Sequence, residues 1–200
     1  MDIHLIAALG NNESKYDNTR HNIGFKWINQ LANKNHLTWQ KASFSKGLVT
    51  KIVGSDQKSI ILFKPGRLMN INGESIAKCA QYYKISPENI LLVYDDLDLD
   101  TGIIKLKKSS GHGGHNGIRD LQRYMDISRI MRLKIGIDKP QHKSMTSHYV
   151  LQQPSANEAL LLDHSIDYSI NHIDLLFDDH DNQYYEKLAS LNKKESQDGV

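Results

Sequence analysis

Cysteine is almost absent from this 200-residue chain: Cys79 is the only one, so no intrachain disulfide can form. That scarcity favours a reducing compartment, and we expect a cytoplasmic protein. No apolar run reaches the roughly 18 residues that a membrane-spanning helix needs, so no membrane partner is expected. Residues 1–10 carry Asp2 and no basic segment, which favours a first strand over a signal peptide.

Net charge is also small, at +2, but the charges are unevenly distributed. Residues 103–143 hold ten Lys or Arg and three acidic residues, a balance of +7. Residues 157–200 hold three Lys and ten acidic residues, a balance of −7. The basic segment could therefore face a polyanion, although two solvated faces of opposite sign would give the same counts.

Apolar runs and helical patterns alternate along the chain. Two segments flanking the turn signal at 54–57 are typical of a hairpin, and helical spacing continues over a long stretch at 155–177. Strands that alternate with helices indicate the α/β class, with a sheet covered on both faces. The strands are predicted at 3–10, 47–54, 58–65, 89–99, 102–108 and 129–137. The other helices are predicted from 19 or 22 to 33, at 70–85 and at 116–125.

Three polar clusters follow predicted strands: 10–11, 95–96 and 109–117. Functional sites in α/β proteins form at the carboxyl ends of the strands, so we expect these clusters to lie together. The third cluster has four glycines within 111–117. Such a loop could present backbone N–H groups to an anion, yet it matches neither the P-loop nor the dinucleotide-binding pattern. A mobile turn and a glycine backbone packed against a large ligand both remain open.

Two chemistries fit the polar residues of these clusters. A metal site could use His112 and His115, joined by Asp95, Asp98 or His21. A metal-free hydrolase could instead use His21 as a base that activates water, with Asp95 behind it, since no G-x-S-x-G nucleophile motif is present. Asn11, Asn70 and Asn116 lie in or beside the loops of this pattern, and their neutral amides can hold a carbonyl or a water.

Five motifs occur in the order found in bacterial peptidyl-tRNA hydrolases, and the chain resembles that family from about residue 3 to about residue 177. The motifs are LGN…Y…TRHNIGF (9–25), KP…MN…G (64–73), YDDLDL (94–99), SGHGGHNGIRDL (110–121) and RLKIGI (132–137). The resemblance implies a twisted, mostly parallel mixed sheet flanked by helices, and we expect a single domain over 1–185. The chain turns polar from Asp178, which predicts a polar, frayed tail over 186–200.

The resemblance also implies an activity: cleavage of the ester between a peptide and the 3′ end of tRNA, without metal or cofactor, by a cytoplasmic monomer. His21 then matches the catalytic base and Asp95 its partner, while Asn11 and Asn70 match amides of the catalytic site. The positions implied to contact the 3′ CCA end and the peptide are Tyr16, Met69, Asn70, Gly113, His115 and Asn116. Those implied to bind phosphates of the acceptor stem are Lys105, Lys107 and Lys134.

Departures from the family's usual motifs leave every proposed catalytic group in place, so the sequence predicts an active but divergent member. They are Asn12-Glu13 for Pro-Gly, Tyr94 for His, Asn72 for Ser, Lys134 for Arg and Asp138 for Gly. Two rival functions stay open at this point. A non-catalytic RNA-binding protein would show tRNA affinity without turnover. A small-molecule esterase or peptidase would show turnover that does not depend on tRNA.

Overall fold

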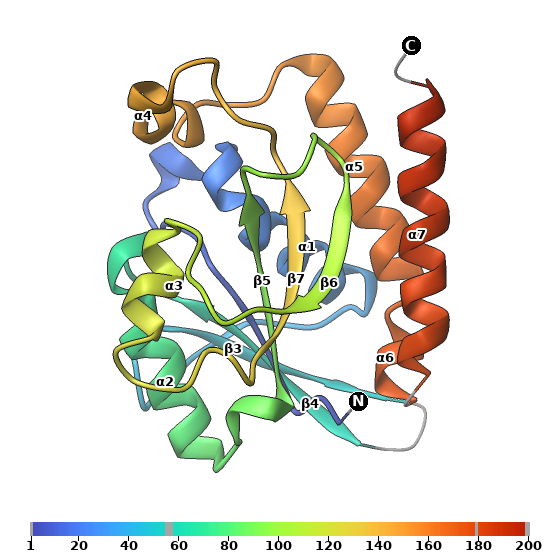
Figure 1. The fold of residues 1–200 in the computed structure, drawn as a ribbon. Coiled ribbons are helices and arrows are strands. Elements are labelled where there is room, and N and C mark those ends of the chain that lie inside the picture. The colour runs from blue at the N-terminus through green and yellow to red at the C-terminus, as the bar shows by residue number, and fades with distance from the viewer. Residues whose placement is uncertain (1, 55–57, 179, 199–200) are drawn as a thin grey trace.

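The computed structural model describes residues 2–54, 58–178 and 180–198, and is organised around a seven-stranded mixed sheet (Figure 1). The strand order is β2-β3-β4-β1-β5-β7-β6. The four strands β4, β1, β5 and β7 are parallel, whereas β2, β3 and β6 pair in antiparallel fashion at the two sides. The strands are β1 (Leu5–Ala8), β2 (Gln40–Lys41), β3 (Gly47–Val53), β4 (Ser59–Pro65), β5 (Ile90–Asp96), β6 (Ile104–Lys108) and β7 (Met131–Gly136).

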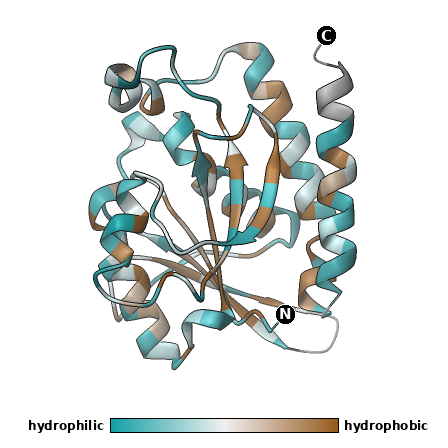
Figure 2. Ribbon diagram, in the orientation of Figure 1, coloured by the Kyte–Doolittle hydropathy of each residue, from teal (hydrophilic) through white to brown (hydrophobic). Residues whose placement is uncertain are grey.

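The predicted α/β class is confirmed, because helices cover both faces of this sheet (Figure 1). Side chains of β1 alternate between the two cores: Ile6 joins one, and Leu5 joins the other. Figure 2 shows much of the central strands as apolar, as expected for strands buried on both sides, with hydrophilic residues at the carboxyl end of β5. One face carries α1 (Ile23–Lys34), α5 (Ala156–Asn171), α6 (Asp174–Phe177) and α7 (Asp181–Asp198), and the other carries α2 (Asn72–Tyr83) and α3 (Asn116–Leu121).

The predicted hairpin is present as β3 and β4, which pair from Gly47–Pro65 to Val53–Ser59. Of its predicted turn at 54–57, residues 55–57 lie outside the described part of the chain. In that described part, no helix has the length and apolar character required to cross a bilayer.

The long helix predicted over 155–177 is instead two helices, α5 and α6. Ser155 and Glu158 form a reciprocal capping box that starts α5, as expected for an N-terminal Ser followed three residues later by Glu. At the other end, the imidazole Nδ1 of His172 lies 2.9 Å from the carbonyl oxygen of Tyr168. That carbonyl is the acceptor that the His172 N–H would use in a continuous α-helix. The helix therefore ends there.

The frayed tail predicted from residue 186 is wrong for most of its length. Helix α7 continues through it, and Tyr184, Leu188 and Leu191 are buried on one side of this helix. The Asn192 side chain accepts from the N–H of Ile104 (3.1 Å) and donates to its carbonyl (2.9 Å), which satisfies the outer edge of β6. A narrow apolar stripe thus attaches a helix whose overall composition is polar.

Candidate active site

The site is centred on Asp95, the next-to-last residue of β5, and on His21 in the 3-10 turn η2 (Arg20–Asn22). The imidazole Nδ1 of His21 lies 3.0 and 2.9 Å from the two carboxylate oxygens of Asp95. Both residues are buried, with 8 % and 3 % of their surfaces exposed. An ionised carboxylate only accepts hydrogen bonds, so His21 carries its proton on Nδ1 and keeps a lone pair on Nε2.

A second histidine shares the same carboxylate. His115 places its Nε2 3.0 Å from Asp95 Oδ1, while its Nδ1 accepts from the N–H of Gly117 and caps α3. Because Nδ1 accepts, Nε2 carries the proton and donates to Asp95. The resemblance implied a substrate contact for His115, and nothing in the sequence pattern indicated this bond to Asp95. The Tyr94 ring packs edge-on against His115, with ring centroids 5.1 Å apart.

The electrostatics of this group favour an ionised carboxylate on Asp95. Burial alone would raise the pKa of Asp95, but the charges and hydrogen bonds of His21 and His115 hold that pKa well below its usual range. Burial lowers the pKa of His115, against the opposing influence of Asp95. Asp95 is therefore ionised and placed to stabilise a positive charge on His21.

Asn11 organises the neighbouring loop. Its side-chain oxygen accepts from the backbone N–H of Met69 at 2.8 Å, and its own backbone N–H and C=O pair with the side chain of Asn22, at 2.7 and 2.9 Å. Asn22 is 1 % exposed and was missed as a functional residue, although it stands directly after His21 in the TRHN motif. The Asn72 amide, at one of the divergent positions, donates to the carbonyl of Gly10 at 2.5 Å.

The segments that carry Asn70 and Asn116 pack together. Asn70 lies in the turn η3 (Met69–Ile71) and Asn116 is the first residue of α3; both are exposed. A side chain at Gly117 would collide with the Met69 sulfur, since an added Cβ would lie 2.9 Å from it. The exposed amides of Asn70 and Asn116 are therefore carried by two segments that pack against each other, and Asn116 directly follows His115, which bonds to Asp95.

Other implied substrate contacts are also accessible. Tyr16 is half-buried in the turn η1 (Ser14–Tyr16), where the Lys15 ammonium lies 4.8 Å from its ring centroid. Gly113 and Gly114 have positive φ angles of 57° and 81°. An added Cβ would meet nothing within 4 Å at either position, so their backbone is open to a ligand.

The three predicted phosphate-binding lysines share one face of the sheet. Lys105 on β6 is paired in register with Lys134 on β7, and Lys107 with Arg132. Lys105 and Lys107 are exposed, whereas Lys134 donates to Asp96 Oδ2 at 2.7 Å. Arg132 was counted within the basic segment but is only 1 % exposed, so it does not present its charge to a polyanion.

The glycine-rich loop reaches the site by a route that the sequence did not indicate. Since β6 runs antiparallel to β7, its carboxyl end at Lys108 pairs with Met131, at the amino end of β7. Asp95 instead pairs with Ile135, near the opposite end. The expectation that all three polar clusters follow carboxyl ends at the same edge is therefore wrong for 109–117. Residues 109–115 therefore run from the amino end of β7 toward its carboxyl end, where His115 bonds to Asp95 (Figure 1).

Three of the five residues considered for a metal site lie close enough together to bind one ion: His21, Asp95 and His115. One ligand atom each from His21, Asp95 and His115 lie within 4.8 Å of one another, and two histidines with one carboxylate are a common zinc-binding set. His112 and Asp98 are not part of this cluster: His112 Nδ1 accepts from the Gly114 N–H, and the Asp98 N–H donates to Asp96.

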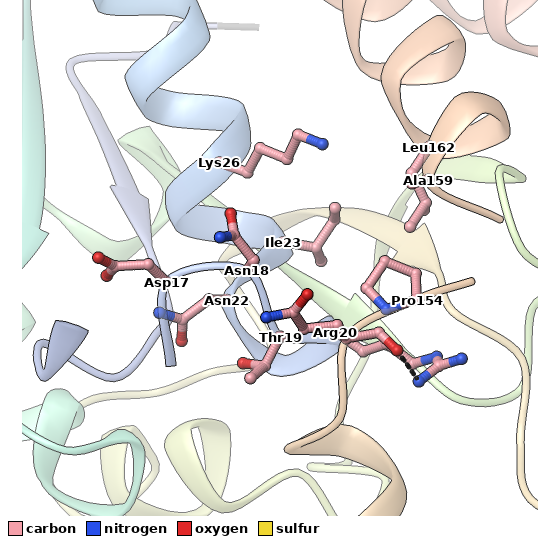
Figure 3. Close-up of a pocket in the computed structure, with 11 residues that line it drawn as sticks. Asp17, Asn18, Thr19, Arg20, Asn22, Ile23, Lys26, Pro154, Ala159 and Leu162 are labelled. Carbon is pink, nitrogen blue, oxygen red and sulfur yellow. Dashed lines mark hydrogen bonds between the residues drawn. The ribbon is translucent and has the colours of Figure 1, made fainter. Parts of the chain in front are cut away.

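Turn η2 is held by a partly buried ion pair, and the same turn lines a cavity of about 190 Å³ (Figure 3). The Arg20 guanidinium donates to both carboxylate oxygens of Glu158, at 2.9 and 2.8 Å, and stacks over the Tyr149 ring. Thr19, directly before the turn, and Asn22, its last residue, line the cavity together with Leu162 of α5. The position of His21 is thus fixed by contacts on both sides of the turn.

Comparisons with known proteins place this chain among relatives of one family. A family model described as peptidyl-tRNA hydrolase matches residues 5–197. The chain is 42% identical over 170 residues to a peptidyl-tRNA hydrolase of Nitrosomonas eutropha, covering 85% of this chain and 87% of that one. It is 39% identical over 172 residues to that of Francisella tularensis subsp. novicida, covering 86% and 90%. The crystal structure of peptidyl-tRNA hydrolase from Acinetobacter baumannii is similar to it with a TM-score of 0.88, at 36% identity and 94% coverage of both chains.

Proposed function

The chain belongs to the peptidyl-tRNA hydrolase family, whose members are enzymes that cleave the ester between a peptide and tRNA, and we propose that it does so with water activated by His21. One observation carries this mechanism: a buried His21–Asp95 hydrogen bond at the carboxyl end of β5, with Nε2 of His21 left as a base. We further propose that the enzyme acts as a cytoplasmic monomer that recycles tRNA from stalled translation. Residues 1–185 are proposed to form one domain, which the rest of α7 extends.

The reaction uses one proton transfer in each direction. His21 Nε2 takes a proton from water as the water oxygen attacks the ester carbonyl, and Asp95 stabilises the resulting imidazolium. An amide N–H of Asn70 or of the glycine-rich loop donates to the oxyanion. Collapse of the tetrahedral intermediate breaks the bond to the tRNA 3′ oxygen, which receives the proton from His21. Asn11 supports this step by holding the backbone of Met69.

The substrate is proposed to lie across the open surfaces around this pair. Tyr16 and Met69 would meet the 3′ CCA end, while Gly113, His115 and Asn116 would line the peptide side. The peptide has no constant sequence, so recognition through an accessible glycine backbone fits this substrate better than specific side-chain pockets. Lys105, Lys107 and Lys134 would then contact phosphates of the acceptor stem, since they lie on one face of β6 and β7.

Chelation of metals should leave the activity intact. We expect release of an N-blocked aminoacyl group from tRNA at the same rate with and without EDTA, because His21 and Asp95 supply base and orienting charge without an ion. Loss of turnover in EDTA, restored by added Zn²⁺, would contradict the metal-free mechanism and favour the cluster of His21, Asp95 and His115. Binding of tRNA without turnover would instead identify a binding protein, and equal turnover of simple esters lacking tRNA would identify a general esterase.

Replacing Lys134 with alanine should raise KM and leave kcat unchanged, because the lysine contacts phosphate and not the reacting ester. The slope of log(kcat/KM) against log salt concentration should become shallower by about 1, the change expected when one phosphate contact is lost. Lys51→Ala is the matched control, since Lys51 is an exposed lysine on β3, across the sheet from β6. Equal salt slopes in the Lys134 variant and the wild type would remove Lys134 from the phosphate site.

A further inference from the structure

Arg132 is a fully buried cation whose hydrogen bonds go to backbone carbonyls. Its guanidinium donates to the carbonyl oxygens of Gly111 (2.6 Å), Ser109 and Ile127 (3.0 Å). Within the described part of the chain, no carboxylate forms an ion pair with it, and its Nε has no hydrogen-bond partner. A buried charge without a counterion is costly unless dipoles around it are well oriented. The carbonyls of Ser109 and Gly111 are therefore held toward Arg132.

The glycine-rich loop has little else to hold it along its first half. Added Cβ atoms at Gly111, Gly113 and Gly114 would all meet nothing within 4 Å, so each of these glycines faces open space on the side where a side chain would stand. Its far end is attached where His115 donates to Asp95. The loop begins where β6 ends, beside the amino end of β7, and Arg132 is the second residue of β7. Arg132 and the His115–Asp95 bond thus attach the two ends of a flexible span.

We propose that Arg132 is a positioning residue for hydrolysis: by binding the carbonyls at 109 and 111 it sets the path along which the loop brings His115 to Asp95 and Asn116 to the substrate. This inference rests on the proposed function, because its catalytic consequence needs His115 and Asn116 in the site. Arg132 belongs to the basic segment 103–143, whose charge balance suggested contact with a polyanion, but this role needs no contact between Arg132 and tRNA. The two roles predict different kinetic signatures.

The test compares Arg132→Met with Arg132→Lys and with the control Arg129→Met. Arg129 is an exposed arginine that pairs with Glu88 at 2.7 Å, before the amino end of β7. For Arg132→Met we expect a loss in kcat of about 10²-fold, the scale of a misplacement of catalytic groups by about 1 Å. The salt slope of kcat/KM should match that of the wild type, because no phosphate contact is lost. Arg132→Lys should recover part of kcat, and Arg129→Met should behave as the wild type.

Amide hydrogen exchange supplies a readout that does not depend on activity. Amides of 109–117 should exchange faster in Arg132→Met than in the wild type, while those of β1 and β5 remain protected. Unchanged exchange in 109–117, or a salt slope reduced by about one with kcat retained, would overturn the positioning role and make Arg132 a phosphate contact. If Arg132→Met does not fold, the same two measurements on Arg132→Lys decide the question. A wild type that lacks turnover would instead refute the proposed function, and the exchange result would still test the loop.

Discussion

Replacing His21 with alanine should lower kcat for peptidyl-tRNA hydrolysis by about 10²–10⁴-fold, the range over which a positioned base contributes. His21 is the base of the proposed mechanism, and its Nδ1–H is already held by Asp95, so only Nε2 can accept the proton of the attacking water. KM should change little, since the ring is 8 % exposed and contributes small contact area to the substrate. The measurement is single-turnover release of an N-blocked aminoacyl group from tRNA.

His4→Ala is the matched control for His21→Ala. His4 pairs with Asp2 on the surface at 3.0 Å and lies before β1, so its removal should leave kcat at the wild-type value. Equal kcat in His21→Ala and the wild type would eliminate His21 as the base. Retained tRNA affinity in the inactive variant would show that the fold and the basic face are intact.

Asp95→Asn should be nearly as damaging, with a loss in kcat of up to about 10⁴-fold, the scale known for removing the orienting carboxylate of a triad. If Asp95 were exposed, water could replace it in part, but it is only 3 % exposed. The substituted amide has one oxygen and one NH₂ group, whereas His21 and His115 both need an acceptor. If the NH₂ group faces His21, then His21 must carry its proton on Nε2 and is no longer a base.

The pH profile separates a wrong tautomer from a correctly oriented base that works at a different pH. A wrong tautomer keeps kcat low at every pH, and raising the pH does not restore it. A variant with normal geometry and only a shifted base would recover at a different pH, which would contradict the orienting role. Thermal unfolding of Asp95→Asn then tests for loss of structure. A cooperative melting transition would show that the variant is still folded.

Local patterns were sufficient to identify much of the site. His21 and Asp95 lie 74 residues apart, yet each stands beside an apolar run that predicts a buried helix or strand, and the recognised motifs surround both. Asn22 and His115 were in the same motifs, but their partners could not be inferred. Asn22 bonds to backbone atoms of Asn11, and His115 bonds to a residue of another strand. Bonds of this kind depend on how distant segments meet.

The sequence by itself determined the order of helices and strands, the α/β class and the residues that could carry the chemistry, because periodicity and turn residues act over a few positions. Only the tertiary structure decided that Arg132 is buried while Lys105 is exposed, and that α7 docks through a narrow stripe. It also decided that the loop at 109–117 starts at the far end of β7. The direction of a strand and the burial of its side chains arise from pairing between distant segments. The local sequence of 103–143 carries no signal for the direction of β6 or for the burial of Arg132.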